Sequence, residues 1–284
     1  MNRYIILIIS TLIFTSSASI ADTSKIKNKF FSSIESFLDS NFEDTDFSIK
    51  SKEGNKPEIG ILTFKPLSDS EDEITFFQGS LFTHDGDRET LNLGFGKRIF
   101  TNDDSVMYGL NAFIDHELDY SHQRVSLGGE IKSSILELST NHYFGISNEK
   151  TGKNNVKEEV ADGYDLELGA HLPHIPSAKI YAKIFEYEIP GGSDFEGMEY
   201  SSKIGIPNSG VNLEVGLKDY GNNSYEDQWF LNLTFSLNKI NPNKSFITDE
   251  AYEKISMKDK KYEKVRRENL IVKSKAFSVK AGGF

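Results

Sequence analysis

Three ionisable residues in one short stretch are the first candidates for chemistry. In "YDLELGAHL", Asp165, Glu167 and His171 occupy the positions between apolar residues. Paired carboxylates beside an imidazole can act as general acid and general base. However, the polar face of any alternating strand commonly carries such groups, so this spacing does not define an active site. We expect no enzymatic activity.

The other residues able to bind metals do not form a ligand pattern. Of the six histidines, only His171 and His174 lie close together, and Pro173 between them favours a turn over a metal site. The "DGD" at Asp85 to Asp87 lacks the ligand series of a calcium-binding loop. The chain has no cysteine, which excludes disulfides and thiolate metal sites. We expect no cofactor and no bound metal.

The beginning of the chain resembles an export signal. "MNRYIILIISTLIFTSSASIAD" combines Arg3, an apolar run from Tyr4 to Phe14, and small residues, with Ser19 and Ala21 in the small-x-small cleavage pattern. We therefore predict that residues 1–21 are a signal peptide cleaved after Ala21. No later stretch approaches the ~20 apolar residues of a spanning helix. With a net charge of -11, the chain is also a poor candidate for binding nucleic acid.

Two flanking segments have helical rather than alternating periodicity. The first, residues 22–43, carries an apolar stripe that predicts an amphipathic helix: Ile26, Phe30, Ile34, Phe37 and Leu38. In the second, residues 249–268, Thr248 or Asp249 can cap a helix and basic residues favour its C-terminal end. By this pattern alone, the second segment is a candidate for a charged, exposed helix.

Between these flanks the chain consists of short alternating runs separated by turn-forming clusters rich in Gly, Asn, Asp, Ser and Pro. Runs joined this tightly must pair antiparallel, because a parallel return needs a long crossover. We therefore predict an up-and-down meander of twelve strands near residues 44–52, 57–66, 72–83, 88–100, 105–118, 121–133, 134–144, 162–172, 177–189, 196–206, 210–220 and 227–238.

The alternation fits a membrane barrel better than a soluble sandwich. Glycines and mixed charges share the polar parity, and short connections coexist with longer polar ones such as residues 145–161, as in outer-membrane barrels. The predicted fold is all-β: a twelve-stranded antiparallel up-and-down transmembrane β-barrel with short flanking helices, facing outer-membrane lipid. The predicted lumen-facing residues are Asn92, Arg98, Asn111, Asp115, Arg124, Glu130, Asp165, Glu167, His171, Glu214 and Lys218.

Two features of the barrel are less well defined. In "EITFFQGSLF" both parities are apolar, so the lipid-facing parity of the first three strands stays open. Aromatic residues near strand ends are candidates for interfacial girdles: Phe100, Tyr108, Tyr143, Tyr164, Tyr187, Tyr200, Tyr220, Trp229 and Phe235. A soluble secreted β-protein or carbohydrate-binding module is the alternative to the barrel.

Several motifs occur in an order and spacing that resemble a known family. "TLNLGFGKR", "GLNAFIDHEL", "GYDLELGAHLP" and "YEKVRRENLIV" are similar to the β-domain of inverse autotransporters, the intimin and invasin family, over about residues 26–275. The resemblance implies a barrel over residues 44–238 in the Gram-negative outer membrane. It also implies a periplasmic helix over residues 239–268 and a linker, residues 269–284, that can thread through the pore.

The resemblance also implies partners and a function. Barrel-assembly machinery and periplasmic chaperones would handle the chain, with Trp229, Leu231, Leu233 and Phe235 of the last strand as the assembly signal. Family members export a C-terminal adhesive passenger, which is linked to virulence. The sixteen residues after Glu268 span at most about 53 Å, so we expect a translocator that anchors or exports its C-terminal segment without a sizeable passenger. The alternative is a passenger-less pore or structural barrel, and the receptor stays unknown.

Overall fold

A computed structural model of the protein describes residues 44–86, 88–221, 225–237 and 246–274. The predicted signal peptide with Ser19 and Ala21, the predicted helix of residues 22–43, and residues 275–284 lie outside the described residues. In the described part of the chain, no helix is both long and apolar enough to cross a bilayer.

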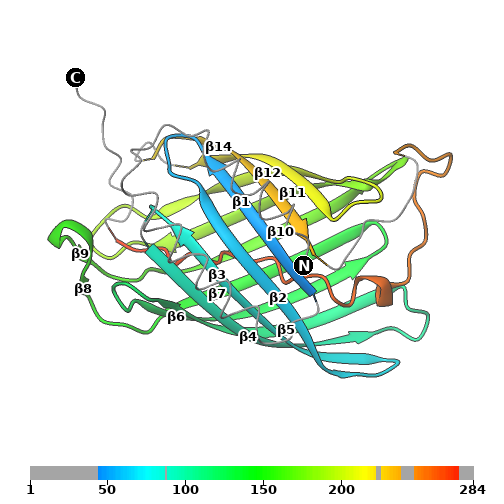
Figure 1. Ribbon diagram of the computed structural model, residues 1–284, viewed down its shortest axis with the longest axis horizontal. Coiled ribbons are helices and arrows are strands. Elements are labelled where there is room, and N and C mark those ends of the chain that lie inside the picture. The colour runs from blue at the N-terminus through cyan, green and yellow to red at the C-terminus, as the bar shows by residue number, and fades with distance from the viewer. Residues whose placement is uncertain (1–43, 87, 222–224, 238–245, 275–284) are drawn as a thin grey trace. The chain divides into compact units, whose positions relative to one another are not determined.

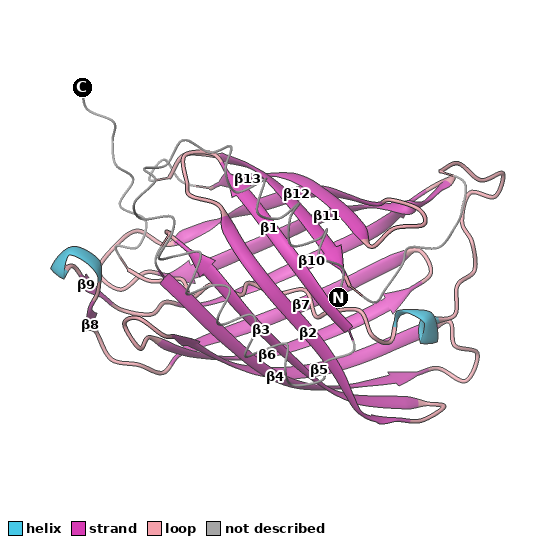
Figure 2. Ribbon diagram, in the orientation of Figure 1, coloured by secondary structure: helices cyan, strands magenta, loops and turns pink. Residues whose placement is uncertain are grey.

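Strands make up most of the described chain, and the helices are two short 3-10 turns, η1 (Lys153–Asn155) and η2 (Met257–Lys260) (Figure 2). A small separate sheet pairs β8 (Lys150–Thr151) with β9 (Lys157–Glu158). The barrel strands are β1 (Asp44–Lys52), β2 (Glu58–Asp69), β3 (Glu73–His84), β4 (Arg88–Phe100), β5 (Val106–Glu117), β6 (Gln123–Ser133), β7 (Leu136–Gly145), β10 (Asp162–Leu172), β11 (Ile175–Glu188), β12 (Phe195–Gly205), β13 (Val211–Tyr220) and β14 (Gln228–Ser236).

These twelve strands form a closed antiparallel barrel in which each strand pairs with its neighbours in sequence (Figure 1). β7 pairs directly with β10, so that β8 and β9 project from the loop between them. β1 pairs with β14 from Asp46↔Ser236 to Lys52↔Phe230, which closes the ring and leaves no free edge. The predicted fold class is confirmed.

The strand positions predicted from alternation are close to the observed ones, and the differences have local causes. β2 continues beyond residue 66 to Asp69, because a bulge between Pro66 and Ser68 accommodates the proline, which has no backbone N–H to donate. β11 begins at Ile175 rather than at 177, where the register shifts between His171 and Leu172.

The two faces of each strand meet different surroundings. On β4, Asn92 and Arg98 are fully buried inside the barrel, whereas Phe95 on the other parity is 59% exposed. Leu110 on β5 is 73% exposed on the same outer surface. An apolar exterior around a polar interior is the arrangement of a membrane barrel, with lipid outside.

The structure also assigns the parity of β2 and β3. Phe64, Ile74 and Phe76 belong to a buried cluster that includes Met257 and Val265 from the chain after the barrel. These residues therefore point inward, which defines the bore-facing parity of both strands; on the opposite parity, Ile61 and Leu81 are also buried. The inner face is apolar here because it packs against the barrel's own C-terminal chain rather than against water.

The prediction of a periplasmic helix over residues 239–268 is wrong for the residues that the structure describes. From residue 246 to 274 only the four residues of η2 are helical. The carbonyls of Lys261, Arg266 and Glu268 accept hydrogen bonds from side chains of the barrel wall, in place of the amides of a helix. Residues 261–268, which were predicted to form the helix, therefore lie inside the barrel.

Candidate functional site

The interior of the barrel contains residues 257–274, which we call the lumenal segment. At one end, which we call the short-turn end, Met257 N donates to Asp104 O in the turn between β4 and β5 at 2.8 Å. At the other, the long-loop end, Ala161 N donates to Val272 O at 3.0 Å and Ser274 N donates to Glu159 O at 2.8 Å. Figure 1 shows the segment, orange to red, running between these two ends.

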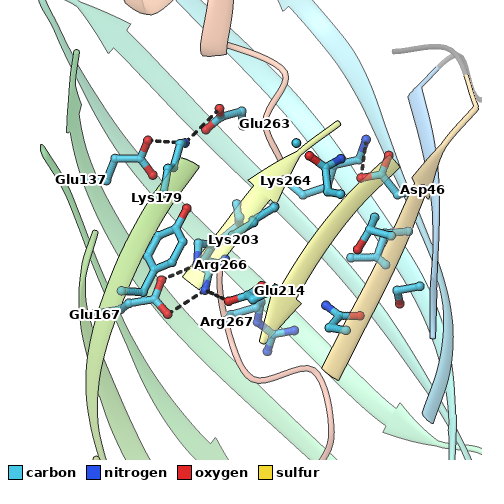
Figure 3. A pocket seen from close by; sticks show the side chains of 18 of the residues that line it. Asp46, Glu137, Glu167, Lys179, Lys203, Glu214, Glu263, Lys264, Arg266 and Arg267 are labelled. Atoms are coloured by element: carbon cyan, nitrogen blue, oxygen red, sulfur yellow. Dashed lines mark hydrogen bonds and ion pairs between the residues drawn. The ribbon is translucent and has the colours of Figure 1, made fainter. Parts of the chain in front are cut away.

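Near the short-turn end the charges of the segment alternate with those of the wall. Lys260 Nζ lies 3.0 Å from Glu137 Oε1 and 3.0 Å from His171 Nε2. Glu263 Oε2 lies 3.1 Å from Lys132 Nζ, and Lys179 bridges Glu137 and Glu263 at 2.6 and 3.6 Å (Figure 3). Each buried charge therefore has an opposite charge beside it, which offsets the cost of removing it from water.

Two consecutive arginines fix the middle of the segment to opposite sides of the barrel. Arg266 contacts Glu167 on β10 and Glu214 on β13, the latter at 3.0 Å (Figure 3). Arg267 donates two hydrogen bonds to Asp115 on β5, at 2.9 and 2.7 Å. Bidentate arginine–carboxylate pairs are directional as well as strong, so these contacts define the position of the segment along the bore.

The backbone of the segment bonds to side chains, because the wall's own backbone groups are used in the barrel. Wall side chains donate to four carbonyls and accept from two amides of the segment. The pairs are Arg98 to Lys261 O (2.5 Å), Asn141 to Arg266 O (3.0 Å), Arg124 to Glu268 O (2.7 Å), Asn92 to Asn269 O (2.9 Å), Val265 N to Gln78 (2.8 Å) and Glu268 N to Tyr143 (2.7 Å).

At the long-loop end a group of buried charges surrounds the last lysine of the segment. Arg88 Nη1 lies 3.0 Å from Glu117 Oε1 and 2.9 Å from Glu158 Oε2. Lys273 Nζ contacts Glu117 Oε2 and lies 3.9 Å from Glu158 Oε2. His122, directly before β6, places Nε2 3.2 Å from Glu158 Oε2. We call Arg88, Glu117, His122, Glu158 and Lys273 the rim cluster.

The structure places every predicted lumen-facing residue on a buried, inward position. Those that contact the lumenal segment are Asn92, Arg98, Asp115, Arg124, Glu167, His171 and Glu214. Others bond within the wall: Glu130 to Arg98 at 2.6 Å, Lys218 to Glu199 at 3.4 Å, and Asp165 to Asn141 at 2.7 Å. Asn111 lies beside Gly128 on the inner face. Asp165, Glu167 and His171, considered first for acid–base chemistry, thus belong to this interior network.

Some residues inside the barrel differ from the predictions made from alternation. Phe100, Tyr143, Tyr187 and Tyr220 are buried in clusters inside the barrel, so their assignment to an interfacial girdle is wrong. In contrast, Tyr108, Tyr200 and Trp229 are exposed on the outer surface. Gln78, Glu137 and Asn141 also face the bore, and they are absent from the residues predicted to line it. Alternation alone would have found Glu137 and Asn141.

The lumenal segment does not fill the bore. A cavity of about 490 Å³ remains beside it, lined mainly by residues of β1 and β10–β14 and by the segment itself. Figure 3 shows Lys203 and Glu214 on this wall beside Arg266, with Asp46 near Lys264. Charged residues make up half of the lining, and apolar side chains such as Leu62, Phe82 and Phe230 contribute to the rest.

Comparison with known proteins identifies the family. Residues 15–269 match the protein family described as "Inverse autotransporter, beta-domain". The chain belongs to the inverse autotransporter family. This inverse autotransporter barrel is 35% identical over 135 residues to the "Putative attaching and effacing protein homolog" of Escherichia coli (strain K12), covering 47% of this chain and 43% of that protein. It is 28% identical over 182 residues to the "Invasin" of Yersinia enterocolitica, covering 61% of this chain and 21% of that protein.

The chain thus spans less than half the length of these relatives. A solved structure titled "Unveiling the Mechanism Behind the in-meso Crystallization of Membrane Proteins" has a TM-score of 0.68 at 21% identity, covering 81% of this chain and 99% of that one, and supports the fold. The inverse autotransporter barrel resides in the Gram-negative outer membrane. Because such barrels keep short turns in the periplasm and longer loops outside, the lumenal segment runs outward from η2 to Ser274.

Proposed function

We propose that this barrel anchors and exports its own C-terminal segment to the cell surface, in a role related to adhesion. The observation that carries the proposal is the path of residues 257–274. They cross the bore in the outward direction, from the turn at Asp104 to the loop at Glu159. The name of the invasin relative supports an adhesive role for what lies beyond.

The chemistry of the bore supports this role. Charges of the segment pair with charges of the wall, and four of its carbonyls accept hydrogen bonds from wall side chains. These contacts allow a polar chain to reside at membrane depth. The wall and the segment are parts of one chain, so whatever follows Ser274 is covalently anchored to the membrane. The contacts between the lumenal segment and the wall account for this network of charges without a bound small substrate.

An accessibility experiment tests the proposal. A peptide tag after Phe284 should be removed by protease added to intact cells. A matched control tag in the turn at Pro207–Asn208, between β12 and β13, should resist until the outer membrane is permeabilised. A C-terminal tag that is protected as well as the control tag would contradict export.

We further propose that Trp229, Leu231, Leu233 and Phe235 serve as the assembly signal read by barrel-assembly machinery, and that a signal peptide directs secretion. Trp229 and Leu231 lie exposed on the outer face of β14, the strand that closes the barrel on β1. Trp229→Ala with Phe235→Ala should lower the heat-modifiable fraction in cells. Val215→Ala, an exposed outer residue of β13, is the control and should assemble normally.

The cavity beside the segment favours a second candidate, a passenger-less pore. If the barrel works as a pore, it conducts steadily and deletion of residues 257–284 changes the conductance little. If the lumenal segment closes the bore, the same deletion raises single-channel conductance severalfold. Planar bilayer recordings distinguish the two.

A further inference from the structure

Three residues of the rim cluster bring potential metal ligands together. Glu117 ends β5, His122 precedes β6, and Glu158 lies in β9 of the long loop. One ligand atom from each lies within 4.8 Å of the others, and all three side chains are buried. Glu117 and His122 flank the same β5–β6 turn, whereas Glu158 comes from the long loop between β7 and β10, so the fold brings the loop carboxylate to the turn.

Two histidines at this place are not used by the interior network. Neither ring nitrogen of His122 has a hydrogen bond to any residue that the structure describes, although Nε2 lies 3.2 Å from Glu158 Oε2. His84 places Nε2 3.9 Å from Glu117 Oε2, and its Nδ1 likewise lacks a hydrogen-bond partner among the described residues. A buried imidazole that is aimed at a carboxylate but not hydrogen-bonded calls for an explanation.

The charge balance shows what occupies the centre of the cluster. The two carboxylates are balanced by Arg88, which bridges Glu117 and Glu158 on one side, and by the ammonium of Lys273 on the other. Lys273 is only 1% exposed. If Lys273 leaves, one buried negative charge loses its partner, which is costly. The position of this ammonium is therefore one that a cation must fill.

We propose that Glu117, His122 and Glu158, with His84 as a fourth ligand, form a binding site for a divalent cation of the zinc type. The Lys273 ammonium fills the site while the lumenal segment is seated, and the metal fills it when Lys273 withdraws. Imidazole and carboxylate ligands together suit Zn²⁺. Neighbouring ligand atoms in a tetrahedral zinc site lie about 3.4 Å apart, so the spacings of up to 4.8 Å among Glu117, His122 and Glu158 must contract on binding. His84, 3.9 Å from Glu117 Oε2, must move in with them. The metal site does not depend on the proposed export function, because metal binding requires only that Lys273 leaves the cluster.

Zinc binding to the full-length chain in detergent tests the proposal. Lys273→Met should bind about one Zn²⁺ per chain, measured by titration calorimetry and metal analysis, at least about tenfold more tightly than the wild type, where the ammonium competes. Lys258→Met is the matched control, because Lys258 pairs with Asp104 at the short-turn end, 3.0 Å away; it should behave as the wild type. Lys273→Met combined with His122→Gln should lose the zinc, and Mg²⁺ should not replace it.

Folding of each variant is checked by heat-modifiable mobility, and a second measurement uses the unaltered protein. Saturating Zn²⁺ should speed hydrogen exchange of residues 270–274 in the wild type, because the metal displaces Lys273, and should leave residues 257–262 unchanged. The proposal is overturned if Lys273→Met binds no more zinc than Lys258→Met, or if zinc binding survives His122→Gln. Unchanged exchange of residues 270–274 at saturating zinc would equally overturn it.

Discussion

The pairing of Arg267 with Asp115 makes a quantitative prediction about how firmly the lumenal segment is held. Both side chains are fully buried, and two hydrogen bonds of 2.9 and 2.7 Å join them. Breaking a buried ion pair by removing one partner costs about 3–5 kcal/mol. Because Arg124 still pairs with Asp115 at 2.8 Å, the lower end of that range applies to Arg267→Met. Methionine also preserves apolar contact with Phe113, over whose ring the guanidinium now lies.

About 3 kcal/mol corresponds to roughly a hundredfold larger fraction of barrels with a displaced segment, since each 1.4 kcal/mol is about a factor of ten. Two assays report this fraction: hydrogen exchange of residues 261–274, and the frequency of open events in planar bilayers. The control is Lys258→Met, whose pair with Asp104 is partly exposed on both sides and is worth about 1 kcal/mol or less. If Arg267→Met and Lys258→Met open equally often, the reasoning from buried pairing is refuted.

The wall and one turn provide two further predictions. Gly96→Val places a Cβ 2.3 Å from the Phe76 ring, and this overpacking should cost about 1–3 kcal/mol, lowering the temperature at which the fast-migrating folded form is lost. In the turn after β4, hydrogen bonds from Thr101 and then Ser105 lower the pKa of Asp103 from 3.8 to about 2. Its contribution to the turn is therefore complete above about pH 4 and is lost as pH falls through 2. Asp103→Ala should speed exchange of the Ser105 amide at pH 7.

Each of these two predictions has a clear opposite outcome. A Gly96→Val barrel as heat-resistant as the wild type would mean that the inner wall yields easily around Phe76. If Asp103→Ala and the wild type keep different Ser105 protection below pH 2, the ionised carboxylate is not what holds the turn.

Most of the wall could be predicted because alternation is a local signal. In "LNLGFGKRIF" every second residue faces lipid and its neighbours face the bore, so a ten-residue window contains both the strand and its orientation. The same reasoning failed to orient β3, because Ile74 and Phe76 are inward and apolar. Their partners Met257 and Val265 lie far away in the sequence, where no local pattern reveals them.

The threaded path after η2 could not be predicted for the same reason. Tyr262 and Val265 have helical spacing, and the surrounding charges would suit an exposed helix. What decides the conformation is that Arg267 meets Asp115 and Glu263 meets Lys132, contacts that span more than a hundred residues. Local propensity is weak beside several buried ion pairs. Tyr143 was misplaced similarly, since its hydroxyl accepts from Glu268 N.

A chain that passes through a closed ring of strands carries mechanical load in a particular way. The bonds between the lumenal segment and the wall are distributed from Asp104 at one rim to Glu159 at the other. An outward force on the chain beyond Ser274 acts along the bore, so it loads these bonds together in shear and does not break them one after another. The force that the segment resists is thus the sum of its contacts along the bore. The barrel, which is fixed in the membrane, bears the tension.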